Sequence, residues 1–429
     1  MLDITIYNKM MREFIVNKMS VQLLDNEGYS NFLDHDFCDL LVRKSFDKEV
    51  MRQSGCFFTG KKLTSFLLAS VNKKNGEGAI FLDPTCGLGN LLIEASKLLP
   101  VFKELDETLN YWGNHLVGYD IFNEFIEGTK LRIIIEAINR GAKNNCSIEK
   151  AMSLIHRIER KDVMSLNINE LKDVTHALLN PPFSNWNSPR TNYWKNGKIN
   201  SAGIIIDHLI RILPGETEIL AILPDVLRSG SRYHEFRKFL ECNVSGNVEI
   251  WGKFSPKTDV DVFIIKGIKK VDFNTPINWN INEEIGEKLE DHYDISIGPL
   301  VAYRHVNEGV NTLYLHQKNS PTGLVLKEIC ERINFNGRLT KPPFVVIKRT
   351  SSPKDKTRAS ATIINCVESV AVENHLIILS PKDKSFKKCL ELMEILSSEI
   401  TTSYLNDRIR LRHLTISAVK SIPYKKPHL

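Results

Sequence analysis

The sequence predicts an α/β fold in which helices cover both faces of a mostly parallel sheet. Two observations carry this prediction: short apolar runs with strand character alternate with segments of helix composition, and the run at 79–83 is closed by an Asp and a Pro. Such alternation is typical of parallel sheets built from strand–helix–strand units. The expected strands lie at 79–83, 116–120, 218–224, 248–254 and 261–267, with further strand ends at 160–163 and 176–179.

The helices are expected between these strands. Residues 1–50 mix apolar and charged residues at helical spacing, which favours a small helical lead-in. KKLTSFLLASV, at 61–71, also has a helix pattern. The longer segments of helix composition are at 90–99, 123–140, 202–213 and 231–242.

The chain has 429 residues, which corresponds to two or three domains. We expect a helical N-terminal segment at 1–50, an α/β domain at 51–270, a polar linker at 271–300 and an α+β domain at 301–429. The last of these contains short strands near 343–349 and 375–381 and one helix at 385–400.

Composition excludes several classes of protein. Hydrophobic residues make up 42% and charged residues 25%, as in ordinary soluble proteins. No apolar run approaches the roughly 18–20 residues that span a bilayer, so no membrane partner is expected. Eight scattered cysteines without a CxxC pair argue against a disulfide framework and a zinc site. They favour a reducing cytoplasm, and we expect no metal.

Positive charge is concentrated near the C-terminus. Residues 341–429 contain 16 Lys and Arg against 8 Asp and Glu, whereas residues 1–340 contain 41 against 43. The whole excess of the net charge of +6 therefore falls in the last fifth of the chain. A basic segment favours a polyanion such as nucleic acid, although a lysine-rich solvated surface gives the same count.

A glycine-containing loop follows the first strand, in FLDPTCGLGNLLIEAS. Glycines here let the backbone approach a ligand, and the next helix begins with free N–H groups. Position 92 is Leu where a dinucleotide fingerprint has a third glycine, and no Lys-Ser/Thr pair follows. Asp83, Gly87 and Gly89 therefore suit a ligand with one nucleoside and no pyrophosphate.

Two further aspartates stand at expected strand ends. Asp120 closes the strand 116–120, where a carboxylate can accept from two ribose hydroxyls, and Asp162 follows a third strand. A single Asp in such a place is more often a helix N-cap. Three at successive strand ends, one with a Gly-x-Gly loop, favour a binding site.

The strand at 176–179 stops at Asn180-Pro181-Pro182-Phe183. Two prolines fix φ and push the preceding residues into extended geometry. One amide and one aromatic ring are therefore held on a stiff turn at the carboxyl edge of the sheet.

Together, residues 83–89, 118–120 and 180–183 resemble, in this order, the S-adenosylmethionine-dependent adenine-N6 DNA methyltransferases of restriction–modification systems. GCFFTGKKLTSFL at 55–67 is similar to the N-terminal cofactor motif of the γ arrangement, and 222–240 and 251–266 are similar to later motifs. The resemblance covers about residues 50–267. The chain departs from the family in having Gly60 instead of Pro, and a 37-residue gap between Asp83 and Asp120 with an apparent insertion at 101–114.

The resemblance implies a Rossmann-like methyltransferase domain at 51–270, with S-adenosylmethionine as cofactor. The residues that it assigns to cofactor binding are Phe58, Thr59, Asp83, Thr85, Gly87, Gly89, Asp120, Ile121, Asp162, Val163 and Asn180. The residues that it assigns to catalysis are Asn180, Pro181, Pro182, Phe183 and Phe254.

The implied chemistry concerns the exocyclic amine of adenine, whose lone pair is delocalised into the ring. In the family pattern the Asn180 side-chain oxygen and the Pro181 carbonyl accept its N–H groups, which requires no strong base. The base must leave the duplex, and Phe183 and Phe254 are the expected stacking rings. Phe254 has the alternative of an ordinary core residue.

The region 341–429 resembles the target-recognition domains of restriction–modification systems, and its basic excess suits double-stranded DNA as a partner. A stabilising cap domain is the alternative. A cognate restriction endonuclease is a further candidate partner.

Three rival functions stay open at this point: a modification subunit of a multi-subunit system, a methyltransferase for protein glutamine or RNA, and a non-catalytic DNA-binding protein. The short N-terminal lead-in, the basic C-terminal region and the intact motif residues favour the sequence-specific DNA methyltransferase.

Overall fold

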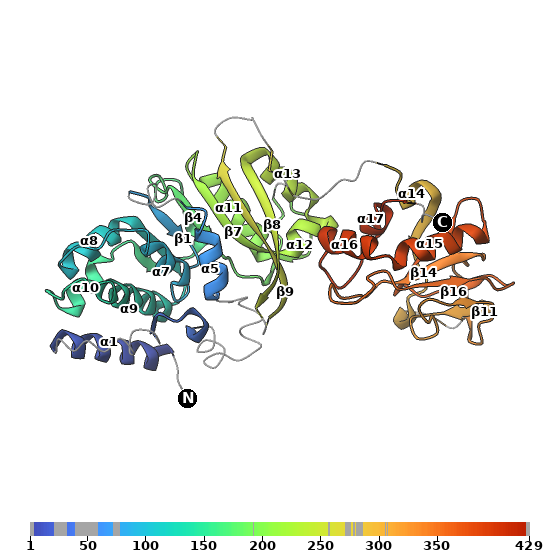
Figure 1. Ribbon diagram of the computed structural model, residues 1–429, viewed down its shortest axis with the longest axis horizontal. Coiled ribbons are helices and arrows are strands. Elements are labelled where there is room, and N and C mark those ends of the chain that lie inside the picture. The colour runs from blue at the N-terminus through green and yellow to red at the C-terminus, as the bar shows by residue number, and fades with distance from the viewer. Residues whose placement is uncertain are drawn as a thin grey trace. The chain divides into compact units, whose positions relative to one another are not determined.

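The computed structural model describes residues 4–20, 32–38, 59–71, 78–191, 193–255, 258–270, 276, 277, 279, 286–304, 306 and 308–425 (Figure 1). The chain divides into two compact units. The first comprises residues 1–228 and 233–280, and the second comprises residues 229–232 and 281–429. The expected boundaries at 50, 270 and 300 stay predictions.

The first unit is built on a seven-stranded sheet in the order β3-β2-β1-β4-β7-β9-β8. The first five strands in this order pair in parallel, and β9 adds antiparallel to β7 and to β8. The predicted mostly parallel α/β fold is thus confirmed. The strands are β1 (Phe81–Asp83), β2 (Leu116–Asp120), β3 (Ile158–Arg160), β4 (His176–Leu179), β7 (Glu218–Pro224), β8 (Val244–Ser255) and β9 (Thr258–Lys269).

Helices cover both faces of this sheet because neighbouring strand residues point to opposite sides. Phe81 belongs to the core beneath the helices of the N-terminal half, whereas Leu82 belongs to the core beneath α11 and α13. The helices of the first unit are α1 (Ile4–Ser20), α5 (Lys61–Leu68), α7 (Asn90–Ser96), α8 (Leu105–His115), α9 (Asn123–Asn139), α10 (Ile148–Leu154), α11 (Ser201–Ile212), α12 (Asp225–Ser229) and α13 (His234–Asn243).

Three local expectations for the first unit need correction. The apparent insertion contains helix α8, whose Trp112 is fully buried and donates to the Pro100 carbonyl oxygen at 2.8 Å. The strand expected to end at 160–163 ends at Arg160, and a 3-10 turn follows at Val163–Ser165. The helix expected from 231 begins with a 3-10 turn, Ser231–Tyr233, so α13 starts at His234.

The second unit has a five-stranded sheet in the order β10-β17-β14-β15-β12 and a three-stranded sheet in the order β13-β11-β16. The smaller sheet packs on one face of the larger one, and helices α15–α17 pack on the other. The strands are β10 (Tyr293–Ile297), β11 (Val310–Leu315), β12 (Val325–Leu326), β13 (Arg332–Phe335), β14 (Phe344–Lys348), β15 (Ala361–Ile364), β16 (Val370–Val372) and β17 (Leu376–Pro381). The helices are α14 (Leu289–His292), α15 (Phe386–Ser397), α16 (Glu399–Arg408) and α17 (Ile416–Lys420).

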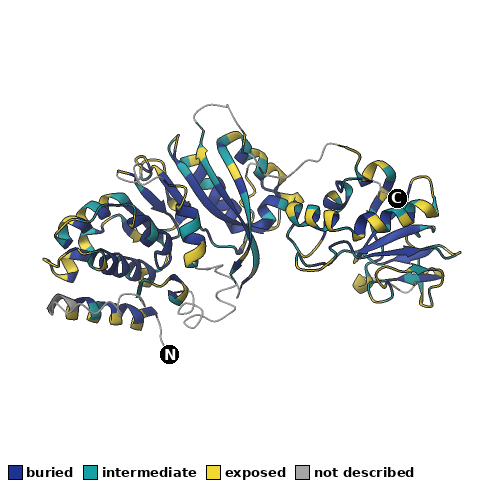
Figure 2. Ribbon diagram, in the orientation of Figure 1, coloured by how far each residue is buried: buried dark blue, intermediate teal, exposed yellow. Residues whose placement is uncertain are grey.

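Within each unit the strands are largely buried, and the exposed residues lie mainly on helix outer faces and loops (Figure 2). The expected helix 385–400 is two helices, because Ser398 ends α15 and caps α16 through the Thr401 amide. The expected linker 271–300 is wrong in its last part: Tyr293 and Ile295 are buried where β10 pairs with β17.

No helix among the described residues is both long and apolar enough to serve as a membrane span.

Candidate active site at the carboxyl edge of the sheet

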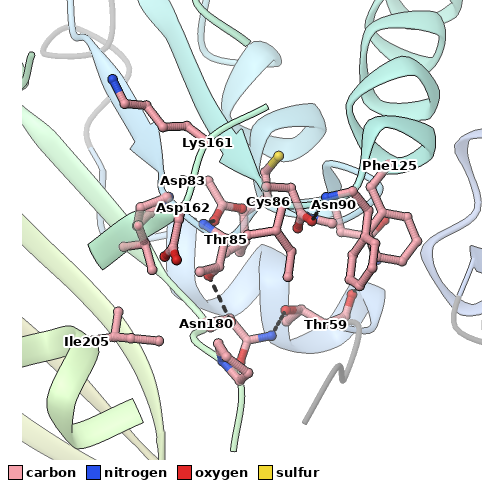
Figure 3. A pocket seen from close by; sticks show the side chains of 18 of the residues that line it. Thr59, Asp83, Thr85, Cys86, Asn90, Phe125, Lys161, Asp162, Asn180 and Ile205 are labelled. Carbon is pink, nitrogen blue, oxygen red and sulfur yellow. Dashed lines mark hydrogen bonds between the residues drawn. The ribbon is translucent and has the colours of Figure 1, made fainter. Parts of the chain in front are cut away.

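A cavity of about 260 Å³ opens at the carboxyl ends of β1, β2 and β4, where the loops of three parallel strands meet (Figure 3). Ligands of open α/β sheets bind at this edge. The lining residues are Thr59, Asp83, Pro84, Thr85, Cys86, Gly87, Asn90, Leu91, Asp120, Ile121, Phe122, Phe125, Lys161, Asp162, Val163, Asn180, Pro182, Trp186 and Ile205.

Asp83 is the most deeply buried carboxyl group of this cavity. It ends β1, is 2% exposed, and accepts a hydrogen bond from the Thr85 amide at 3.3 Å. Burial raises its pKa to about 8; the Thr85 amide opposes the rise, and the nearby Asp120 charge adds to it. A carboxyl group in this environment gains from a cation placed beside it.

Asp120 ties the glycine loop to the end of β2. Its two oxygens accept from the amides of Gly87 and Phe122, both at 3.0 Å. Burial raises the pKa of Asp120 to about 6, and these backbone donors limit the rise. Each carboxylate oxygen has a second lone pair, so the group keeps acceptor capacity for a ligand hydroxyl.

The glycine loop has the backbone that the sequence suggested. Gly87 and Gly89 have φ values of 54° and 79°, in the left-handed region that favours glycine. A Cβ atom at Gly89 would lie 2.6 Å from Cγ2 of Thr129, whose hydroxyl donates to the Gly87 carbonyl oxygen at 2.8 Å. Gly89 therefore shapes the loop without lining the cavity.

Asp162 has two roles in the structure. It lines the cavity and also caps the 3-10 turn by accepting from the Met164 amide at 2.9 Å. Its neighbours Lys161 and Val163 line the cavity as well, and the Lys161 ammonium pairs with Glu170. The sequence-based site and N-cap interpretations of Asp162 are thus compatible.

Asn180 lies directly beyond β4 and is oriented by two neighbours. Its Nδ2 donates to the Thr59 hydroxyl at 2.8 Å, and its backbone carbonyl accepts from the Thr85 hydroxyl at 3.4 Å (Figure 3). Pro182 lines the cavity on the same turn, whereas Pro181 is buried and does not.

The turn after Asn180 is fixed to the start of α11. The Ser201 side chain donates to the Pro182 carbonyl, its amide donates to the Ser184 carbonyl at 2.8 Å, and Asn200 Nδ2 donates to the Phe183 carbonyl at 3.3 Å. Backbone groups that two prolines leave without strand partners are therefore satisfied by side chains distant in sequence.

Phe183 and Phe254 come together, although neither lines the cavity. Their ring centroids are 5.7 Å apart and the planes meet at 83°, an edge-to-face pair. Phe254 is 5% exposed and belongs to the core of the first unit near the end of β8, whereas Phe183 is half-buried. The expected polar turn around Phe254 is thus the end of a strand.

Sequence reasoning missed several site residues. Asn90 donates to the Thr59 carbonyl oxygen at 2.8 Å and accepts from the buried Arg132 at 2.7 Å. Phe125, Trp186 and Ile205 supply apolar walls of the cavity. Their sequence neighbourhoods carry no motif that would have separated them from ordinary helix and strand positions. Among expected residues, Phe58 lies outside the described part of the chain.

The N-terminal motif also departs from its family pattern at Gly60. The φ of Gly60 is −69°, which a proline would tolerate. A Cβ atom there would lie 2.8 Å from Oδ1 of Asp36. The described neighbourhood thus gives a steric reason for glycine at this position.

The cavity suits an adenine nucleoside that carries a positive charge. Two buried carboxyl groups with raised pKa favour a cation, and aromatic and aliphatic walls suit a purine ring. Among the described residues, no group of three or more His, Cys, Asp or Glu side chains could hold a metal ion. A family model described as N-6 DNA Methylase matches residues 38–267.

The chain belongs to the N-6 DNA methylase family. The cofactor of this family is S-adenosylmethionine, and the donor groups of the cavity fit it. No match is found among curated proteins.

Solved structures show the same fold at low sequence identity. The type IIL restriction-modification enzyme MmeI, solved in complex with DNA, has a TM-score of 0.55 and 12% identity over 92% of this chain and 72% of its own. The type IIG restriction endonuclease BpuSI has a TM-score of 0.42 and 12% identity, and this chain spans 58% of it while 85% of this chain is covered. A modification subunit of a putative type I restriction enzyme from Vibrio vulnificus has a TM-score of 0.39 and 15% identity, over 59% of this chain and 52% of its own.

Proposed function

We propose that this protein is a sequence-specific DNA methyltransferase that methylates N6 of an adenine flipped out of duplex DNA, within a restriction–modification system. The observation that carries the proposal is the Asn180 amide. It is held beyond β4 by the Thr59 hydroxyl, at a cavity that also contains the buried carboxyl groups of Asp83 and Asp120.

Asn180 and Pro181 supply the chemistry at the target base. The exocyclic amine of adenine is a poor nucleophile because its lone pair is delocalised into the ring. The Asn180 side-chain oxygen and the Pro181 carbonyl oxygen would accept its two N–H groups and stabilise the positive charge that develops on nitrogen. Preorganised acceptors of this kind lower the barrier without a strong base.

S-adenosylmethionine supplies an electrophilic methyl group on a sulfonium. Asp83 and Asp120 would hold its charged and hydroxyl groups, with the loop of Thr85, Gly87 and Gly89 between them. Phe58, Thr59, Ile121, Asp162, Val163 and Asn180 complete the proposed cofactor site. The raised pKa values of Asp83 and Asp120 support a cationic ligand.

Two aromatic rings are proposed to receive the flipped base. Leaving the duplex costs a few kcal/mol, and stacking on an aromatic ring returns about 1–3 kcal/mol per base. Phe183 follows the acceptor pair directly, and Phe254 contacts it edge to face. With Pro182, these two rings complete the catalytic set.

The second unit is proposed to recognise the DNA target, since the positive excess of the chain falls at 341–429. The likeness of fold to an enzyme solved in complex with DNA supports this assignment. A cognate restriction endonuclease is a proposed partner of the system.

Methyl transfer to unmethylated plasmid DNA tests the proposal. The purified full-length protein is incubated with plasmid and S-adenosylmethionine that carries a tritiated methyl group, and the DNA is digested to nucleosides. We expect the label in N6-methyldeoxyadenosine, at a limited number of sites per plasmid. Label in a cytosine nucleoside, or label that goes to RNA or protein but not to DNA, would overturn the proposal.

A further inference from the structure

The Lys and Arg residues of the C-terminal region are concentrated in two short segments. Of the 16 that follow residue 340, eight lie within 348–358 and 408–413, where Asp355 is the only acidic residue. These eight are Lys348, Arg349, Lys354, Lys356, Arg358, Arg408, Arg410 and Arg412.

The fold brings these two segments side by side. The Ser351 amide donates to the Arg412 carbonyl at 2.7 Å, and the Leu414 amide donates to the Arg349 carbonyl at 2.8 Å. The Thr350 hydroxyl and His413 Nδ1 are also within hydrogen-bond distance, at 3.2 Å. Charges that are about 60 residues apart in sequence therefore share one surface, which we call the two-loop surface (residues 348–358 and 408–413).

Arg358 lies beneath this surface and connects its two segments. Its side chain is fully buried, and its guanidinium donates to the carbonyl oxygens of Ser351 at 2.6 Å, Ile409 at 2.9 Å and Leu411 at 3.1 Å. The planar fork of arginine suits several fixed acceptors at once. The surface is thus built on a rigid base rather than on two independent loops.

The lysines of the two-loop surface are open to solvent. Lys354 and Lys356 are exposed, and neither has an ion-pair partner among the residues that the structure describes. Asp355, which lies between them, accepts from the Ser352 amide at 2.6 Å and so closes its own turn. Elsewhere in the second unit, by contrast, Arg332 pairs with Glu368 at 2.7 Å.

We propose that the two-loop surface binds the phosphate backbone of duplex DNA and positions the second unit on it without reading the sequence. The inference rests on the proposed function and adds a specific surface to it. Lys and Arg contacts to phosphates release condensed counterions, so their loss weakens binding and reduces its salt dependence.

The test compares two pairs of lysines in the full-length protein. K354Q/K356Q removes two charges from the two-loop surface. K384Q/K387Q removes two exposed charges that follow the end of β17. Because β14 and β17 are antiparallel and Lys348 pairs with Leu376, this control pair follows the opposite end of the sheet from the two-loop surface.

Binding to a fluorescent duplex oligonucleotide is measured by anisotropy over a series of salt concentrations. We expect K354Q/K356Q to reduce the slope of log affinity against log salt by about 1–2, equally for oligonucleotides of different sequence. The slope of K384Q/K387Q should match that of the unmodified protein.

Equal slopes for K354Q/K356Q and the unmodified protein would overturn the surface, and so would an equal loss in both double variants. In those cases the unmodified protein still binds and methylates DNA, and the proposed function stands. If the unmodified protein binds no duplex DNA, the proposed function itself fails.

A different set of contacts leads to a second inference, about the orientation of Asn180. Arg132, fully buried on α9, donates to Asn90 Oδ1 at 2.7 Å and also to the Leu88 carbonyl. This sets the Asn90 amide so that its Nδ2 donates to the Thr59 carbonyl at 2.8 Å. Thr59 in turn accepts from Asn180 Nδ2 at 2.8 Å.

We infer that Thr59 and Arg132 are positioning residues for the proposed acceptor. An amide is planar, so turning its NH₂ group toward Thr59 places the Asn180 oxygen on the other branch. Accepting from the target amine requires this orientation. The inference rests on the proposed function.

Turnover at saturating cofactor tests it with Thr59→Val, Thr59→Ser and Arg132→Lys. Losing an acceptor for a buried donor costs about 1–3 kcal/mol, so Thr59→Val should reduce kcat about tenfold with little change in KM for DNA. Thr59→Ser keeps the hydroxyl and should restore kcat. If the two positions act as one relay, the losses in the Thr59→Val/Arg132→Lys double variant should be less than multiplicative.

Normal kcat in Thr59→Val, equal loss in Thr59→Ser, or fully multiplicative losses would overturn the relay. Methylation of adenine by the unmodified protein in the same assay keeps that failure separate from failure of the proposed function.

Discussion

The cavity of the first unit and the two-loop surface of the second unit both use charge, but in opposite environments. Asp83 and Asp120 are buried, so desolvation shifts their pKa values strongly. Lys354 and Lys356 are exposed, and water and salt screen them. The comparison teaches that the cavity should respond to pH and to single substitutions, whereas the two-loop surface should respond to salt and to the number of charges removed.

The largest expected effect is on catalysis in the buried region. Asn180→Ala removes one of the two proposed acceptors and should reduce kcat by about 10²–10³-fold, the usual effect of losing one preorganised group. The measurement is turnover at saturating cofactor and DNA, at low and at high salt. The ratio to the unmodified protein should not depend on salt, because the lost interaction lies inside the site.

Calorimetry on Asn180→Ala should give a cofactor affinity close to that of the unmodified protein, since the amide is proposed to act on the base. Turnover near the unmodified level would contradict the role of Asn180. A kcat ratio that changes steeply with salt would contradict the contrast between the two regions.

The next effect concerns the aromatic pair, which lies between core and site. Phe183→Ala should cost about 1–3 kcal/mol in productive insertion of the base. A 2-aminopurine at the target adenine reports insertion, because its fluorescence rises when it leaves the stack. Overall DNA affinity should fall little, since backbone contacts dominate it.

Phe254→Leu is the matched variant, because it keeps apolar volume in the buried position but removes the ring. If Phe254 is a stacking ring, the 2-aminopurine signal changes in this variant too. An unchanged signal with normal turnover would assign Phe254 to the core, where its 5% exposure already places most of its surface.

The smallest expected effect is a pH dependence of cofactor binding. With a pKa of about 8, Asp83 is mostly protonated at pH 7 in the free protein, and Asp120, at about 6, is mostly ionised. A cationic ligand favours ionised carboxylates, so binding should release a proton near pH 7. Affinity should rise with pH by up to about tenfold between pH 6.5 and 7.5.

Calorimetry in buffers of different ionisation enthalpy measures this proton release, with Asp83→Asn as the control that cannot release a proton. A pH-independent affinity in the unmodified protein would contradict the cation-binding role of Asp83. The stability of the protein without cofactor has the corresponding sign. The folded pKa of Asp83 is raised above its usual value of 3.8, so its contribution is fully present below about pH 4 and is lost as pH rises through 8.

Local patterns predicted the parts of the site that lie on one stretch of chain. Asp83 with Gly87 and Gly89 is a strand–loop–helix signal, and Asn180 with two prolines is a strand end and a turn; the structure has both at the expected places. Alternating strands and helices also predicted the parallel sheet. These features depend on backbone preferences and on burial periodicity, which act over a few residues.

Only the tertiary structure decided which distant side chains meet. The hydrogen bond between Thr59 and Asn180 joins residues 121 positions apart, and the one between Arg132 and Asn90 joins residues 42 apart. Arg358 likewise connects loops at 351 and at 409–411. Composition placed the positive charge in the last fifth of the chain, but the packing of the second unit placed it on one surface. The physical reason is that a side-chain hydrogen bond needs positions fixed to a fraction of an ångström, and the packed core fixes them where no local pattern can.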